Sequence, residues 1–419
     1  MLLIAVVAAY LAAHVVFEWI ARRFLIVSAA EYLLLGVLLG PQVAGVVGQP
    51  LLDSFAPVLT LALGWIGAIA GTQFELRRLL RIPAVEYRIA FAESFATMIA
   101  VGGLEYFVLQ WHLGGSGTTA APAAVALAAM AVASSNVGIA VVARVLGVRG
   151  AVLEQLTVSS SINGFVAVMA IGLLLCVQHI AVPAQRPLTA TEWAVVSIAL
   201  GVIGGALFHL FLGDTSEPDR LFIALVGGVV LVSGAATYLH LSPLFAGFFF
   251  SVTLVNSMVR PDALVKVLHR VEQPLYYVLL IFGGAAWQPS HRAWLAPVLL
   301  FIAMRAAAKI AGSRLAARLN GALPRLGLHW GRALLGQGRL ALAIGLNFLR
   351  QEGMEYRNIV FTAAIASILV TEFFSARFAR SAVEGAGAGA DEAGAAPAGA
   401  DSFQGEAVEV DAAADSVRP

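Results

Sequence analysis

The stretch AVASSNVG, residues Ala131 to Gly138, interrupts an apolar run with polar and helix-weakening residues. A second cluster, SSSING from Ser159 to Gly164, lies inside the next apolar run. Hydrocarbon leaves polar groups unsatisfied, so both clusters should face protein or a water-filled cavity. Two such segments in tandem are typical of a transporter site built from broken helices. The alternative is that these residues only form hydrogen bonds between packed helices.

The composition places these clusters in a membrane. The chain has 419 residues, of which 60% are hydrophobic and only 12% are charged. Soluble domains carry about 25% charged residues, so an all-α polytopic membrane protein is expected. The net charge of +1 suggests no nucleic-acid partner. The single cysteine, Cys176, can form no internal disulfide.

The apolar runs predict about thirteen transmembrane helices, each close to the roughly 20 residues that a bilayer requires. The first is expected to be a retained helix rather than a cleaved signal, because no basic region precedes it. The thirteen lie near residues 2–20, 26–47, 54–72, 89–111, 121–145, 152–178, 191–212, 221–239, 242–258, 273–290, 293–316, 330–350 and 356–376.

The arginine and lysine residues test this count. With thirteen crossings, 19 of the 26 fall on one side, four fall on the other and three lie inside spans. The positive-inside rule then predicts a multi-pass protein of the cell membrane, a bacterial inner membrane, with the N-terminus outside and the C-terminus in the cytoplasm. Residues 1–382 form the predicted transmembrane domain. Residues 383–419 are rich in Ala, Gly, Asp and Glu and predict a disordered acidic cytoplasmic tail.

The order of the spans predicts an inverted repeat of five helices, spans 2–6 against spans 9–13. An odd number of spans per repeat inverts the second copy relative to the first. The break after Ser134, with Gly138, then pairs with Gly336-Gln337-Gly338 in the twelfth span. Two broken helices crossing at the midplane would place opposed helix dipoles around one site. The glycines of the twelfth span could instead only allow close helix packing.

Several motifs occur in a recognisable order between residues 25 and 378. They are Gly36 to Pro41, Gly71 to Arg78, Ala133 to Asn136, His240 to Gly247, Glu272 to Pro274 with Phe282 to Gly284, and Arg305 and Lys309 with Gly312. In this order they resemble the monovalent cation:proton antiporter superfamily, which has the sodium/proton exchanger-like fold. The resemblance implies a homodimer with a scaffold domain and a moving core, and transport of a monovalent cation and protons by alternating access.

The sequence departs from the family at its ion-coupling motif. The family usually has an Asn-Asp or Asp-Asp pair in the sixth span, where this chain has Asn163-Gly164. Asparagine can coordinate a cation but cannot titrate, and glycine can do neither. Arg339 stands where the twelfth span often has an acidic residue. The predicted ion- or substrate-binding residues are Ser134, Ser135, Asn136, Asn163 and Gly164.

Four ionisable residues form a predicted charged core: Glu93, Arg305, Lys309 and Arg339. Each costs about 2.5–3.5 kcal/mol to insert into lipid, so each should be paired or face water. Glu93 and Lys309 lie at similar depths, so we expect Glu93 to pair with Lys309 or Arg305. If protons are coupled to transport, Glu93 or Lys309 must carry them, because the usual aspartate is absent. The alternative is that Glu93 and Lys309 only extend to the membrane interface.

Three functions remain open from the sequence. The leading hypothesis is sodium or potassium/proton antiport. The second is a carrier of an anionic or neutral solute, because three core cations face one acid and helix N-termini favour anions. The third is a non-transporting sensor or scaffold. An enzyme is disfavoured and no cofactor is expected. His14, His209 and His240 lack ligand-spaced partners, so no metal site is expected.

Overall fold

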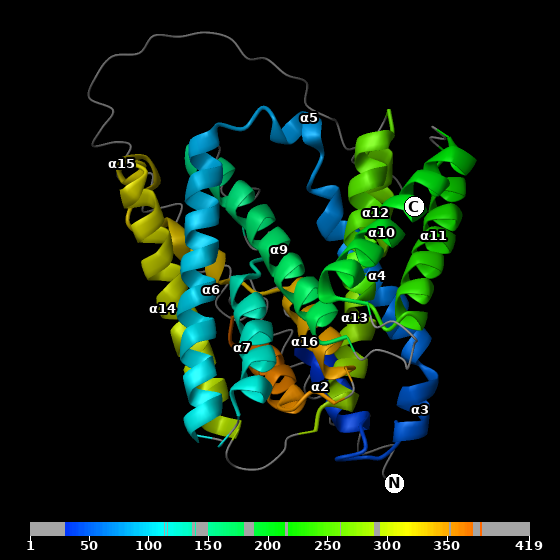
Figure 1. Ribbon diagram of the computed structural model, residues 1–419, viewed down its shortest axis with the longest axis horizontal. Coiled ribbons are helices and arrows are strands. Elements are labelled where there is room, and N and C mark those ends of the chain that lie inside the picture. The colour runs from blue at the N-terminus through cyan, green and yellow to red at the C-terminus, as the bar shows by residue number, and fades with distance from the viewer. Residues whose placement is uncertain are drawn as a thin grey trace, which may run out of the picture.

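The protein is a bundle of helices. The computed structural model describes residues 30–112, 114, 116–135, 139, 150–179, 188–213, 217–259, 261–288, 294–351, 353–371 and 378, and every regular element among them is helical (Figure 1). Within this part, six helices are long and apolar enough to cross a membrane, and four shorter apolar helices accompany them. The all-α polytopic membrane fold is therefore confirmed. The count of thirteen spans stays a prediction, because the first predicted span lies outside the described residues.

The helices follow the predicted spans in chain order. They are α2 (Ala30–Leu39), α3 (Gln49–Ser54), α4 (Ala56–Thr72), α5 (Leu76–Leu79), α6 (Ala84–His112), α7 (Gly117–Val132), α9 (Ala151–Val177), α10 (Ala190–Leu212), α11 (Pro218–Tyr238), α12 (Pro243–Ser257), α13 (Pro261–Ala286), α14 (Leu295–Leu319), α15 (Leu323–Leu326), the 3₁₀ helix η2 (Trp330–Leu335), α16 (Arg339–Leu349) and the helix Arg357–Thr371.

The tenth predicted span was placed too late in the chain. It was expected near residues 273–290, whereas α13 begins at Pro261 and contains Pro274 in its interior. Leu264, Val267 and Leu268 are buried, and this helical spacing makes the segment before residue 273 part of the helix. A proline at the first helical position is also favourable, because its missing N–H needs no partner there. The correction places Glu272 inside the helix, whereas the predicted span began just after it.

The helices pack in two groups. In one, which we call the scaffold group, α4 and α13 pack with each other and with α11 and α12, α2 packs against α13, and α10 packs against α11 and α12. In the other, the core group, α6 packs against α7, α9 and α14. In the same group η2 packs against α14, and α16 packs against α7. Figure 1 shows α6 and α14 on one side of the bundle and α10, α11 and α12 on the other. The two groups meet where α9 and α16 contact α4, α10, α12 and α13.

The scaffold group contains two matching helix pairs. A Cβ atom at Gly36 of α2 would overlap the carbonyl oxygen of Ile281 in α13, and one at Gly67 of α4 would overlap the carbonyl oxygen of Leu244 in α12. Glycine therefore permits backbone contact in both pairs. In the predicted repeat, α2 corresponds to α12 and α4 corresponds to α13. The contact between α2 and α13 is therefore the counterpart of the contact between α12 and α4. This packing agrees with the inverted five-helix repeat.

Candidate functional site

Two interrupted helices cross at the centre of the core group. Helix α7 ends at Val132 and the chain continues extended through Ser135, while η2 ends at Leu335 and α16 begins only at Arg339. The Ser135 N–H donates to the Gly336 carbonyl oxygen at 2.9 Å, and the Ser134 hydroxyl donates to the Leu334 carbonyl oxygen at 3.0 Å. The predicted crossing of two broken segments is therefore present. Gly336 and Gly338 lie at the break, as predicted.

Two basic residues of α14, Arg305 and Lys309, bind the carbonyl ends of both broken helices. Lys309 Nζ lies 2.8 Å from the Val132 carbonyl oxygen at the end of α7. Arg305 Nη1 lies 2.7 Å from the Leu335 carbonyl oxygen at the end of η2, and Nη2 lies 3.3 Å from that of Ala133. A helix that ends inside a membrane leaves carbonyl groups unsatisfied and a negative dipole end. Both cations supply these missing partners.

Glu93 of α6 completes this arrangement. Its Oε1 lies 3.0 Å from Lys309 Nζ, and the Thr97 hydroxyl donates to the same oxygen at 3.0 Å. Both side chains of the ion pair are fully buried, so the predicted pairing is present and neither residue extends to an interface. A buried pair loses hydration on both charges, so it is stable only when further hydrogen bonds surround it. The Thr97 hydroxyl and the Val132 carbonyl supply them here.

Asn163 and Gly164, which the resemblance predicts at the coupling position, differ in their surroundings. Asn163 is buried, and its amide is occupied on both sides: the Ser94 hydroxyl donates to Oδ1, and Nδ2 donates to the Ser134 hydroxyl at 3.1 Å. Gly164 lines a cavity, and a Cβ atom there would meet only Leu340 Cδ2 at 3.5 Å. Asn163 therefore holds α9 against α6 and the crossing, while position 164 has room for a side chain that faces the cavity.

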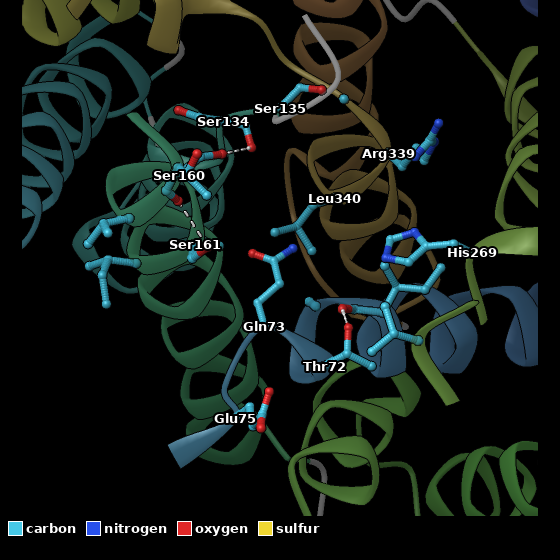
Figure 2. A pocket seen from close by; sticks show the side chains of 18 of the residues that line it. Thr72, Gln73, Glu75, Ser134, Ser135, Ser160, Ser161, His269, Arg339 and Leu340 are labelled. Atoms are coloured by element: carbon cyan, nitrogen blue, oxygen red, sulfur yellow. Dashed lines mark hydrogen bonds between the residues drawn. The ribbon is translucent and has the colours of Figure 1, made fainter. Parts of the chain in front are cut away.

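A cavity of about 1200 Å³ leads to the crossing. Figure 2 shows its four labelled serines on one side, His269 and Arg339 on the other, and Gln73 and Leu340 between them. Ser134, Ser135, Ser160 and Ser161 come from the extended segment and from α9. Among the described lining residues, four are acidic and two are arginine, so the formal charge is −2 with His269 neutral: Glu75, Glu154, Asp262, Glu272, Arg78 and Arg339. Hydroxyl oxygens and net negative charge suit a hard cation.

Arg339 has a partner that the sequence analysis missed. It forms an ion pair with Glu272 of α13, and its guanidinium lies 5.5 Å from the centre of the Tyr276 ring. Glu272 Oε2 also lies 2.6 Å from His269 Nδ1. The sequence analysis required Arg339 to be paired or to face water but named no acid as its partner, because the tenth span was expected to begin only near residue 273. The helical spacing of Leu264, Val267 and Leu268 is the signal that could have placed it.

Not every predicted site residue is described. Asn136 and Gly138 lie outside the described residues, so only the α7 side of the first break is visible. Within the described part, the residues that could meet an ion at the crossing are Ser134, Ser135, Ser160 and Gly164. No group of three or more His, Cys, Asp or Glu residues in the same part could hold a metal ion.

Comparison with known proteins supports the fold. No family model and no curated protein sequence matches the chain. The structure resembles that of the sodium proton antiporter MjNhaP1 from Methanocaldococcus jannaschii at pH 8, with a TM-score of 0.62 and 14% identity over 91% of this chain and 100% of that one. It also resembles the electron-microscopy structure of that antiporter, with a TM-score of 0.60 and 15% identity over 94% and 97% of the two chains. The chain has the sodium/proton antiporter fold. At these identities the likeness concerns the fold alone.

Proposed function

We propose that the protein is a secondary transporter that exchanges a monovalent cation, sodium or potassium, for protons by alternating access. The observation that carries this proposal is the acidic, serine-lined cavity that ends where the two broken helices cross. A cation entering it meets negative charge first and hydroxyl oxygens at the crossing. The likeness in fold to a sodium proton antiporter is consistent with this function.

The coupling to protons is assigned to Glu93 and Lys309. Position 164, where the family has an aspartate, is glycine and cannot titrate. The Glu93–Lys309 pair lies directly behind the extended segment at the crossing, since Lys309 also binds the Val132 carbonyl oxygen. Loss of the Lys309 proton would leave the negative charge of Glu93 for an entering cation to neutralise. One positive charge would thereby replace another, which is the requirement for exchange.

A carrier for an anionic solute is less well supported by these contacts. That hypothesis depended on three cations facing a single acid and on helix N-termini that favour anions, and the contacts bear on the first of these. Lys309 is paired with Glu93, and Arg339 is paired with Glu272. Arg305 is directed at two carbonyl oxygens in the interior and is only 1% exposed. No described cation of the predicted core is thus left facing the cavity without a partner.

The proposed setting is a homodimer in the cell membrane, with its partners being the lipid bilayer, a monovalent cation and protons. With the N-terminus outside, as the basic residues predict, the cavity mouth lies on the cytoplasmic side. Arg78, Gly150 and Asp262 line the cavity, and each lies in or directly beside a connection on the side predicted to be rich in basic residues. Residues 1–382 would form the transport domain and residues 383–419 a cytoplasmic tail.

Ion flux into proteoliposomes tests the proposal. The purified protein is reconstituted with a pH-sensitive dye inside, and a sodium or potassium gradient is applied. The expected result is proton movement opposite to the cation gradient, lost in Glu93→Gln and retained in the exposed control Lys266→Gln. Proton-dependent uptake of an organic anion without cation-driven proton flux would instead identify an anion carrier. Absence of all flux from folded protein would contradict transport.

A further inference from the structure

Helix α16 connects the two helix groups at the end remote from the cavity. Asn347, in the last turn of α16, donates from Nδ2 to the Ser242 hydroxyl of the scaffold group at 2.6 Å, and both side chains are buried. Arg350, the residue that follows α16, donates from Nη1 to the Thr60 hydroxyl at 2.9 Å and to the Ala56 carbonyl oxygen at 3.3 Å. These bonds join the core group to α4 and to the start of α12.

This connection lies on the opposite side of the crossing from the cavity. The cavity reaches α16 only at Arg339 and Leu340 and reaches α4 no deeper than Ile66. At about 1.5 Å per residue, Arg350 lies roughly 16 Å along α16 from Arg339. Buried contacts fill that distance, since residues 341–348 are all buried. The side bearing Arg350 is therefore closed where the cavity side is open.

The contacts of Arg350 are of a kind that can be released. Among the described residues no carboxylate pairs with Arg350, so its charge meets only neutral oxygens. It also lies at the first turn of α4, where the positive end of the helix dipole disfavours a cation. Hydrogen bonds from a charged group to neutral acceptors stabilise the closed side without the cost of breaking a buried ion pair.

We propose that Arg350, with Asn347, seals the side opposite the cavity and that alternating access requires Arg350 to leave Thr60. Arg350 is thus a positioning residue for the proposed transport cycle, which this inference presupposes. It acts by setting the balance between the state described here and the state open on the other side. It contacts neither the serines of the cavity nor the Glu93–Lys309 pair.

The test measures access without requiring any substrate. Cys176, the only cysteine, is changed to serine, and Ser161→Cys supplies a reporter in the cavity wall. The Ser161 hydroxyl bonds only to Thr157 within its own helix, so the change leaves contacts between helices intact. A membrane-impermeant maleimide is applied to vesicles of each orientation, and the ratio of the two labelling rates is measured. The variant Arg350→Ala removes the donor of the hydrogen bond to Thr60, and Thr60→Val removes its acceptor. Arg357→Ala, at an exposed position, is the control.

The expected result is a shift of about tenfold or more in the labelling ratio toward the Arg350 side for both seal variants. Tenfold corresponds to about 1.4 kcal/mol, within reach of a hydrogen bond to a charged group. An unchanged ratio in either folded variant, or an equal shift in Arg357→Ala, would overturn the proposal. A shifted ratio without cation-driven proton flux would support the seal and contradict the proposed exchange. Flux with an unshifted ratio would contradict the seal alone.

Discussion

Replacing Lys309 by methionine should destabilise the protein far more than replacing an exposed lysine. Methionine keeps much of the side-chain volume but removes the ammonium group that lies 3.0 Å from Glu93 and 2.8 Å from the Val132 carbonyl oxygen. Glu93 would then be a buried carboxylate with only Thr97 as a hydrogen-bond donor among its described contacts. Removing one partner of a buried pair costs about 3–5 kcal/mol, and we expect a loss in this range.

The double variant Glu93→Gln/Lys309→Met separates this cost from simple loss of packing. With both charges of the pair absent, neither Glu93 nor Lys309 leaves a buried charge without its partner, and such replacements are often neutral. The double variant should therefore recover at least about 2 kcal/mol relative to Lys309→Met, a coupling that only contacting residues show. The free energy of unfolding is measured in mixed micelles, with Lys266→Met on the exposed face of α13 as the control. A cost of less than about 1 kcal/mol for Lys309→Met, as found for exposed pairs, would refute the buried pair.

Three further predictions concern coupling and packing. Gly164→Asp should create or raise cation/proton exchange, because the new side chain would face the cavity beside the crossing. Ser161→Asp, one turn away, should not raise exchange. Equal gains in both variants would contradict the assignment of the ion site to position 164. In Glu93→Gln, any cation transport that remains after the loss of proton coupling should no longer depend on pH, and an unchanged pH profile would remove Glu93 from coupling. Gly67→Ala should lower stability by about 1–3 kcal/mol through overlap with α12, whereas Gly234→Ala, with open space around it, should be tolerated in the same unfolding assay.

The helices and the interrupted segments were predictable from the sequence because lipid imposes strict local rules. Apolar runs of span length, serines and glycines within them, and cations inside α14 all have direct physical meanings in hydrocarbon. The pairing of Glu93 with Lys309 followed from depth alone, since both lie at similar distances from helix ends. These inferences needed no knowledge of how the helices are arranged laterally.

The remaining contacts depend on lateral arrangement, which a single sequence does not encode locally. Glu272 and Arg339 are 67 positions apart, and Ser94 and Asn163 are 69 apart. Depth gave several possible partners for each, and the late start predicted for α13 left Glu272 out of the charges counted inside the membrane. The roles of Asn347 and Arg350 were missed for the same reason. Each is an ordinary polar residue near a helix end until α4 and α12 are placed beside it.

The hydrogen bond between Ser135 and Gly336 limits the rate at which ions could be transported. Because it fastens the two extended segments to each other, neither can shift alone without losing a backbone partner in a dry interior. Both segments must then travel as one body with the helices attached to them. Motions of that size take microseconds to milliseconds, so each ion should cross at the pace of a carrier and not at the rate of a continuous pore.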